Sequence, residues 1–211
     1  MENSRVPRWL PNLLSIIRVL LVPVFVATLI FMRKIPVWGI IVPVAIYIIT
    51  ALTDALDGFI ARKYNLVTEF GKFIDPLADK FMVISSMIAI LAWLIMTAKT
   101  EMDVNFVYDF LFVTVIILLR ELTVTGLRLA VKGEVDLGAN IFGKLKTVSQ
   151  MVGTVVIMAE RKTAFLGSPV IDFIRENHIL SYIALAVMLF TTIWSMVEYM
   201  KAYLPLIDFK K

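Results

Sequence analysis

The sequence predicts an all-α integral membrane protein with six transmembrane helices. Hydrophobic residues make up 60% of the 211 residues and charged residues only 18%, whereas soluble proteins average roughly 45 to 50% apolar residues. The mean hydropathy is +0.86. Long apolar runs leave too little polar sequence for a separate soluble module, so we expect a single transmembrane domain that covers residues 1–211.

A helix needs about 20 apolar residues to cross a bilayer. The segments that meet this length are, in chain order, 13–32, 36–61, 73–98, 105–131, 139–160 and 178–203. The first follows Arg5 and Arg8, but no small-residue cleavage site comes after it, so we interpret it as a retained span. Pro36 and Pro43 fall in the second, where proline kinks are tolerated.

Lys and Arg in the connections predict the orientation. With six spans both termini share one side, which would hold Arg5, Arg8, Arg62, Lys63, Lys72, Lys132, Lys201, Lys210 and Lys211. The other side would hold Arg33, Lys34, Lys99, Arg161, Lys162 and Arg175. This bias places the chain in the cell membrane with both termini in the cytoplasm. The net charge of +4 suits an anionic leaflet and anionic substrates.

Composition also excludes several kinds of chemistry. The chain has no cysteine, so it carries no disulfide, thiol nucleophile or thiolate metal site. Its one histidine, His178, argues against imidazole catalysis and is interpreted as a residue at the membrane interface. No basic patch with interleaved aromatic residues lies outside the membrane, so we expect no nucleic-acid partner. The expected interfacial anchors are Trp9, Trp38, Trp194, Tyr199 and Tyr203.

Four aspartates, Asp54, Asp57, Asp75 and Asp79, interrupt this apolar sequence. Asp54 and Asp57 are three residues apart and Asp75 and Asp79 four, so each pair lies on one face of its helix. The short polar link from Lys63 to Glu69 would bring the two faces together. Carboxylates at membrane depth cost a few kcal/mol each, and hard oxygen ligands suit magnesium, manganese or calcium. We therefore expect a divalent metal site, with magnesium or manganese favoured if phosphate completes the shell.

Small and basic residues beside the aspartates favour a phosphate ligand. Gly58 and Ala61 lie about one turn apart and leave a groove where a nucleotide could approach the helix backbone. Arg62 adds a positive charge, and Gly71 opens the next helix in the same way. Pro76 is expected in the first turn of that helix, where proline is tolerated.

Residues 54–79 resemble the signature of the CDP-alcohol phosphotransferase family, DxxDGxxAR followed by eight residues and GxxxDxxxD. All fixed positions match: Asp54, Asp57, Gly58, Ala61, Arg62, Gly71, Asp75 and Asp79. The resemblance implies six spans, a homodimer, an active site that opens to the cytoplasm, two Mg²⁺ or Mn²⁺ ions, and Asp79 as general base.

Softer similarity links flanking segments to the phosphatidylglycerophosphate synthase branch of that family. These segments are PNLLSIIRVLLVP from Pro11, RELTVTGLR from Arg120 and GKLKT from Gly143. They imply that CDP-diacylglycerol is the donor and glycerol-3-phosphate the acceptor, with the acceptor phosphate bound by Arg120, Arg128, Lys144 and Lys146. Since Lys144 and Lys146 are two apart, only one of them can face a given pocket on a helix.

Other interpretations stay open on the sequence alone. The aspartates could cap helices or pair with Arg62, Lys63, Lys72 and Lys80. Arg120 and Glu121 could form a buried pair, and Arg18 could reach either lipid headgroups or substrate. A different class, a divalent-cation transporter, would also place carboxylates in a membrane, but these aspartates cluster near one face. Within the enzyme class, serine, inositol phosphate or phosphatidylglycerol could replace glycerol-3-phosphate.

Overall fold

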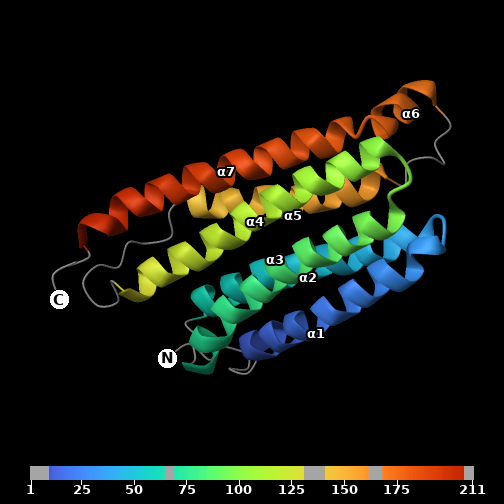
Figure 1. Cartoon of the computed structure of the whole chain (residues 1–211). Helices are drawn as coiled ribbons and strands as arrows, with labels where there is room; N and C mark the ends of the chain where they lie inside the picture. Colours follow the sequence, from blue (N-terminus) through green and yellow to red (C-terminus); the bar gives the residue numbers. More distant parts are fainter. Residues whose placement is uncertain (1–9, 65–68, 131–140, 162–167, 207–211) are drawn as a thin grey trace. The chain divides into compact units, whose positions relative to one another are not determined.

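In the computed structural model, the described residues are 10–64, 69–130, 141–161 and 168–206, and within these ranges the secondary structure is helical without strands (Figure 1). Some side chains inside the helices, including those of all four signature aspartates, are outside the description. The chain folds into two compact units, Met1–Thr97 and Ala98–Lys211, each with its own helix packing. The expectation of a single domain stays a prediction.

The first unit contains α1 (Leu10–Phe31), η1 (Met32–Lys34), α2 (Trp38–Lys63) and α3 (Glu69–Thr97). Helix α1 packs against both α2 and α3. The contact between α1 and α2 includes the rings of Phe25 and Tyr47, whose centroids are 5.2 Å apart. Leu29 on α1 and Trp93 on α3 are almost fully buried. This packing positions the end of α2 and the beginning of α3, which carry the signature aspartates.

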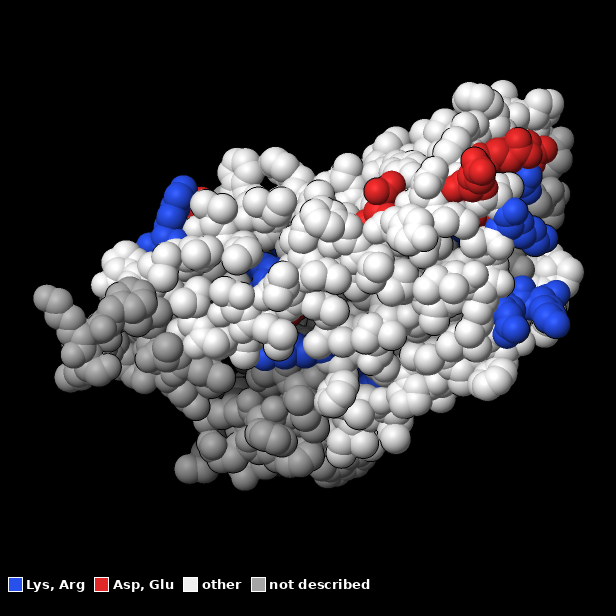
Figure 2. Space-filling model, in the orientation of Figure 1, with Lys and Arg blue, Asp and Glu red and all other residues white. Residues whose placement is uncertain are grey.

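The second unit contains α4 (Glu101–Ala130), α5 (Ile141–Glu160), α6 (Pro169–Glu176), α7 (Ile179–Tyr203) and η3 (Leu204–Leu206). Helix α7 packs along both α4 and α5 (Figure 1). The short helix α6 starts with Pro169. Proline suits the first turn of a helix, because an N–H at that position would have no partner within the helix. Charged atoms gather around α6, while most of the described surface in view is uncharged (Figure 2).

Helices α5 and α7 meet in an antiparallel seam of small and hydroxyl residues. Near the start of α5, a Cβ on Gly143 would lie 2.8 Å from the Tyr199 hydroxyl. Further along, the Ser149 and Thr191 hydroxyls are 2.6 Å apart. A Cβ on Gly153 would lie 2.4 Å from the Met188 sulfur. The glycines therefore allow the two helices to approach closely.

A buried carboxylate fixes the beginning of α7. Glu160, which is 2% exposed, ends α5 and accepts 2.8 Å hydrogen bonds from the Leu180 and Ser181 backbone N–H groups. The Ser181 hydroxyl donates to the same carboxylate. These N–H groups have no partner inside the helix, and a negative charge there also complements the helix dipole. Glu160 thus joins the end of α5 to the start of α7.

The start of α4 is capped and tied to the same region. Asp103 accepts hydrogen bonds from the backbone N–H groups of Lys99 and Thr100, and its own N–H donates to the Thr100 hydroxyl, as in a capping box. Its other oxygen lies 3.0 Å from Arg161 and 3.1 Å from the His178 Nε2. One carboxylate therefore connects the start of α4 with Arg161, directly after α5, and with His178, directly before α7.

His178 corrects one expectation. It is 4% exposed and has a left-handed backbone with φ of 53°, so it is a buried capping position and not an interfacial side chain. Burial is the largest cause that lowers the pKa of His178 below its ordinary value of 6.5, and Arg161 lowers it further, whereas Asp103 and Glu160 oppose the shift. The His178 ring donates its Nε2–H to the Asp103 carboxylate.

The described ranges contain six long helices at about the predicted places, together with α6, which the sequence did not predict. Within the part of the chain that the structure describes, four segments are long and apolar enough to cross a membrane: Asn12–Lys34, Lys80–Thr97, Glu101–Leu127 and Ile179–Tyr203. Six spans therefore stay a prediction. Two proline placements were wrong: Pro36 lies in the turn before α2, and Pro76 lies about two turns inside α3, which already begins at Glu69.

Candidate active site

The signature residues occupy the last turns of α2 and the first turns of α3. Asp54 and Asp57 lie in α2 with Gly58, Ala61 and Arg62. Gly71, Asp75 and Asp79 lie in α3. The helical backbone therefore confirms that each aspartate pair shares a helix face. Whether the two faces meet lies outside the described side chains and stays a prediction.

The donor chemistry of these positions fits a divalent cation. Four carboxylates supply only hard, anionic oxygens, which magnesium and manganese prefer over nitrogen or sulfur ligands. Among the described side chains, no group of three or more His, Cys, Asp or Glu could hold a metal ion. The signature aspartates thus stay the candidate metal ligands of this chain.

The second unit brings together three of the charged residues around the predicted acceptor segments. Glu121 Oε1 lies 3.2 Å from the Arg120 guanidinium and also pairs with the Lys146 ammonium. Arg120 and Lys146 are 5% and 3% exposed, so both cations are buried. Burying a cation in an apolar helix costs free energy unless an anion pairs with it, and such cations are therefore candidates for a functional role. The buried Arg120 and Glu121 pair, which the sequence left open as an alternative to a phosphate site, is present, and Lys146 joins it from α5.

Two residues of α7 that the sequence did not single out for the site hold Arg120. The guanidinium donates a 2.6 Å hydrogen bond to the Ser195 hydroxyl. It also lies 5.4 Å from the centre of the Tyr199 ring, a cation–π distance. Tyr199 and Tyr203 are each 5% exposed, so the prediction that they are interfacial anchors was wrong. The i, i+4 spacing of Ser195 and Tyr199 on one helix face was the only available signal.

The remaining predicted acceptor residues are placed differently. Lys144 is exposed on α5 while Lys146 is buried, as expected for residues two positions apart on a helix. Arg128 lies about two turns beyond Arg120 on α4, and its side chain is outside the description. Only Arg120 and Lys146 of the predicted set are therefore seen together.

Arg18 was expected to reach either lipid headgroups or substrate. It lies on α1 and its side chain is 0% exposed. A snorkelling arginine would carry its charged end to the headgroup region, so the buried guanidinium argues against a headgroup contact.

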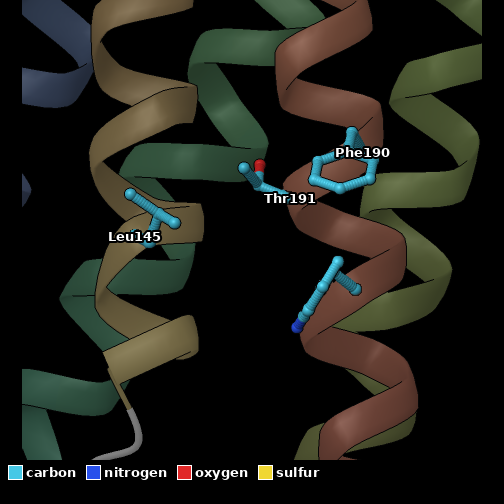
Figure 3. Close-up of a pocket in the computed structure, with 4 residues that line it drawn as sticks. Leu145, Phe190 and Thr191 are labelled. Atoms are coloured by element: carbon cyan, nitrogen blue, oxygen red, sulfur yellow. The ribbon is translucent and has the colours of Figure 1, made fainter.

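An apolar hollow lies on the face of the α5 and α7 pair (Figure 3). It has an empty volume of about 440 Å³, including the open space at its mouth, and is lined by Leu145, Phe190, Thr191 and Trp194. In the view of Figure 3, the Thr191 side chain lies between those of Leu145 and Phe190. The Thr191 hydroxyl is already bonded to Ser149. This mostly apolar lining, with no charged side chain, suits hydrocarbon.

Comparison with known proteins identifies the type of chain. The profile of the CDP-alcohol phosphatidyltransferase family matches residues 8–194. A CDP-diacylglycerol–glycerol-3-phosphate 3-phosphatidyltransferase of Bacillus subtilis (strain 168) is 35% identical over 162 residues, 71% of this chain and 76% of the relative. Another protein described as such an enzyme, from Arabidopsis thaliana, is 34% identical over 91% of this chain and 78% of its own length.

A third relative carries a different description. A cardiolipin synthase (CMP-forming) of Oryza sativa subsp. japonica is 32% identical over 91% of this chain and 56% of its own length. The family profile covers most of the chain, including the signature and the segments of Arg120 and Lys146. This chain therefore belongs to the CDP-alcohol phosphatidyltransferase family.

Proposed function

We propose that this chain transfers the phosphatidyl group of CDP-diacylglycerol to glycerol-3-phosphate, giving phosphatidylglycerophosphate and CMP in phospholipid biosynthesis. The observation that carries the proposal is the 34–35% identity to two glycerol-3-phosphate 3-phosphatidyltransferases. The unbroken aspartate signature supports the same chemistry.

Donor binding belongs to the ends of α2 and α3 in this proposal. Asp54, Asp57, Asp75 and Asp79 would hold two Mg²⁺ or Mn²⁺ ions. Such ions, when bound, polarise a phosphoryl group and stabilise an anionic leaving group. Gly58, Ala61 and Gly71 would let the nucleotide approach the backbone, and Arg62 would add a positive charge for the pyrophosphate.

Asp79 is the proposed general base. Its carboxylate would take the proton of a glycerol-3-phosphate hydroxyl. That oxygen would then form a bond to the phosphorus that carries the diacylglycerol, and the bond from this phosphorus to the oxygen of CMP would break. The proton ends on Asp79 and the electron pair on CMP, so the transfer needs no other reactant.

Acceptor binding belongs to the second unit. Arg120, Arg128 and Lys146 would bind the phosphate of glycerol-3-phosphate, since guanidinium and ammonium groups suit phosphate oxygens. The burial of Arg120 inside the apolar segment Glu101–Leu127 supports this role, because such cations in a membrane segment are functional by default. The exposed Lys144 would act at the edge of the site.

The proposed setting is the cell membrane, crossed six times, with both termini and the active site toward the cytoplasm and with a homodimer as the working form. The bias of Lys and Arg toward one side supports this orientation. In that orientation the anionic, water-soluble acceptor reaches the site directly, and the acyl chains of the donor stay in the bilayer.

The main rival is the same transfer to a different acceptor. The description of the rice relative as a cardiolipin synthase (CMP-forming) favours phosphatidylglycerol as the second candidate. The two acceptors differ in charge and solubility: glycerol-3-phosphate brings a phosphate monoester dianion, while phosphatidylglycerol brings only a diester. A pair of buried cations suits the dianion better.

The test is an acceptor panel with CMP release as readout. Purified protein receives CDP-diacylglycerol, magnesium and, in turn, glycerol-3-phosphate, phosphatidylglycerol, serine or inositol phosphate. We expect release with glycerol-3-phosphate alone, its loss on chelation, and its recovery with magnesium or manganese. Equal rates with phosphatidylglycerol would contradict the acceptor assignment, and full activity after rigorous chelation would contradict the metal site.

A further inference from the structure

Building on the proposed function, in which Arg120 and Lys146 bind the acceptor phosphate, we infer that the Glu121 carboxylate occupies the position of that phosphate in the free protein. The acceptor must displace this carboxylate to bind, so Glu121 lowers the affinity for the acceptor. A single carboxylate oxygen, Glu121 Oε1, contacts both cations. Carboxylate and phosphate bind guanidinium and ammonium groups through the same kind of charge-assisted hydrogen bond.

Charge decides which anion prevails at this cluster. Two cations and one carboxylate leave a net charge of +1 on these three side chains. A phosphate monoester brings nearly two negative charges and three acceptor oxygens, against one charge on Glu121. The acceptor can therefore displace the carboxylate, but it must overcome the attraction that Glu121 already exerts on both cations.

Burial shows which of the three side chains can leave. The side chains of Arg120 and Lys146 are 6% and 4% exposed, whereas that of Glu121 is 13% exposed. Arg120 is additionally held from α7 by Ser195 and by the Tyr199 ring. The guanidinium thus keeps its position when the carboxylate moves, and Glu121 has the larger opening toward the surface.

The charge on Glu121 is tested by Glu121→Gln. The amide oxygen can still accept hydrogen bonds from both cations, so the geometry is kept while the negative charge is removed. With the competing charge gone, the KM for glycerol-3-phosphate should fall by at least about threefold. The product keeps the phosphate, so its release should slow and kcat should fall, while the KM for CDP-diacylglycerol stays unchanged. Inorganic phosphate should inhibit the variant at correspondingly lower concentration.

The matched control is Glu198→Gln, the same substitution at a carboxylate of α7 that pairs with exposed Lys201 at 3.6 Å. It should leave all three constants unchanged. The second variant is Glu121→Asp, which keeps the charge but shortens the side chain by one methylene group. Its KM for glycerol-3-phosphate should lie between those of the parent and Glu121→Gln, and it serves as the test if the amide variant does not fold.

An unchanged or higher KM for glycerol-3-phosphate in a folded Glu121→Gln protein would overturn the inference and leave Glu121 a structural ion-pair partner. An Asp variant with a KM at or above that of the parent would overturn it as well. Failure of the proposed function has a different signature, because the parent protein would then release no CMP with glycerol-3-phosphate.

Discussion

Asp79 is the signature residue with two proposed roles, metal ligand and general base. The roles respond differently to one amide substitution, because asparagine keeps an oxygen that can coordinate a cation but cannot take a proton from the acceptor. We expect Asp79→Asn to bind CDP-diacylglycerol and stay slower than the parent by about 100-fold to 10,000-fold at saturating magnesium, the typical loss of a general base. CMP release over a magnesium titration measures this.

The control for Asp79→Asn is Asp57→Asn, which in the proposal loses only a metal ligand. High magnesium should restore part of the rate of Asp57→Asn and none of the chemical deficit of Asp79→Asn. If saturating magnesium returned Asp79→Asn to within a few-fold of the parent rate, Asp79 would be a ligand only.

At this scale the sequence predicted the residue types better than their surroundings. Arg120, Glu121 and Lys146 could be found because the segments RELTVTGLR and GKLKT resemble those of the phosphatidylglycerophosphate synthase branch. Ser195 and Tyr199 could not, because a serine and a tyrosine near a helix end are ordinary, and only the fold brings them to the guanidinium. His178 was interpreted as a residue at the membrane interface because nothing in the sequence indicates that the Asp103 carboxylate contacts it.

At the scale of elements, the close approach of α5 and α7 should carry changes in packing to Arg120, a proposed acceptor-binding residue. A Cβ on Gly143 would lie 2.8 Å from the Tyr199 hydroxyl, so Gly143→Ala must displace the ring that stacks on Arg120. We expect Gly143→Ala to lower the Tm and to raise the KM for glycerol-3-phosphate several-fold. Thermal unfolding in detergent and steady-state kinetics measure the two effects.

Gly126→Ala on α4 is the matched control, since a Cβ there has no atom within 4 Å among the described surroundings. Gly126→Ala should leave the KM for glycerol-3-phosphate unchanged. Its free energy of unfolding should rise by up to about 0.5–1 kcal/mol, because alanine lowers the backbone entropy of the unfolded chain. If both variants showed the same fall in Tm and the same rise in KM for glycerol-3-phosphate, the close contact at Gly143 would have no special role.

Element positions were predicted to within a few residues because apolar length is a strong signal. The start of α3 at Glu69 was predicted four residues late, at 73, because the charged residues before that position shorten the continuous apolar run, although Phe70, Phe73 and Ile74 keep helical spacing. The helix α6 was missed because eight residues of mixed polarity give no membrane signal. Pro76 was misplaced for the same reason as the start of α3.

For the whole molecule, the proposed orientation can be tested directly because the chain has no cysteine of its own. Glu176 on α6 and Lys201 near the end of α7 have side chains that are each 71% exposed, and the candidate span Ile179–Tyr203 lies between them. A membrane-impermeant maleimide applied to intact spheroplasts should label Glu176→Cys and spare Lys201→Cys. Permeabilised cells should label both.

The opposite labelling pattern would invert the orientation, and labelling of both sites in intact spheroplasts would mean that α7 does not separate them. This experiment also bears on the site, because Lys201 lies at the same end of α7 as Ser195 and Tyr199. A protected Lys201→Cys would therefore put the Arg120 cluster at the cytoplasmic end of its unit.

The contacts at the two ends of the α5 and α7 seam limit where residues can be inserted or deleted. Gly143 receives Tyr199 at one end, and Glu160 receives Ser181 at the other. Removing one residue between these anchors would turn the rest of the helix by about 100° and shift it by about 1.5 Å, so one of the two contacts would be lost. Insertions and deletions among related chains that keep both anchors should consequently fall outside residues 143–160 and 181–199, and accumulate in the connections instead.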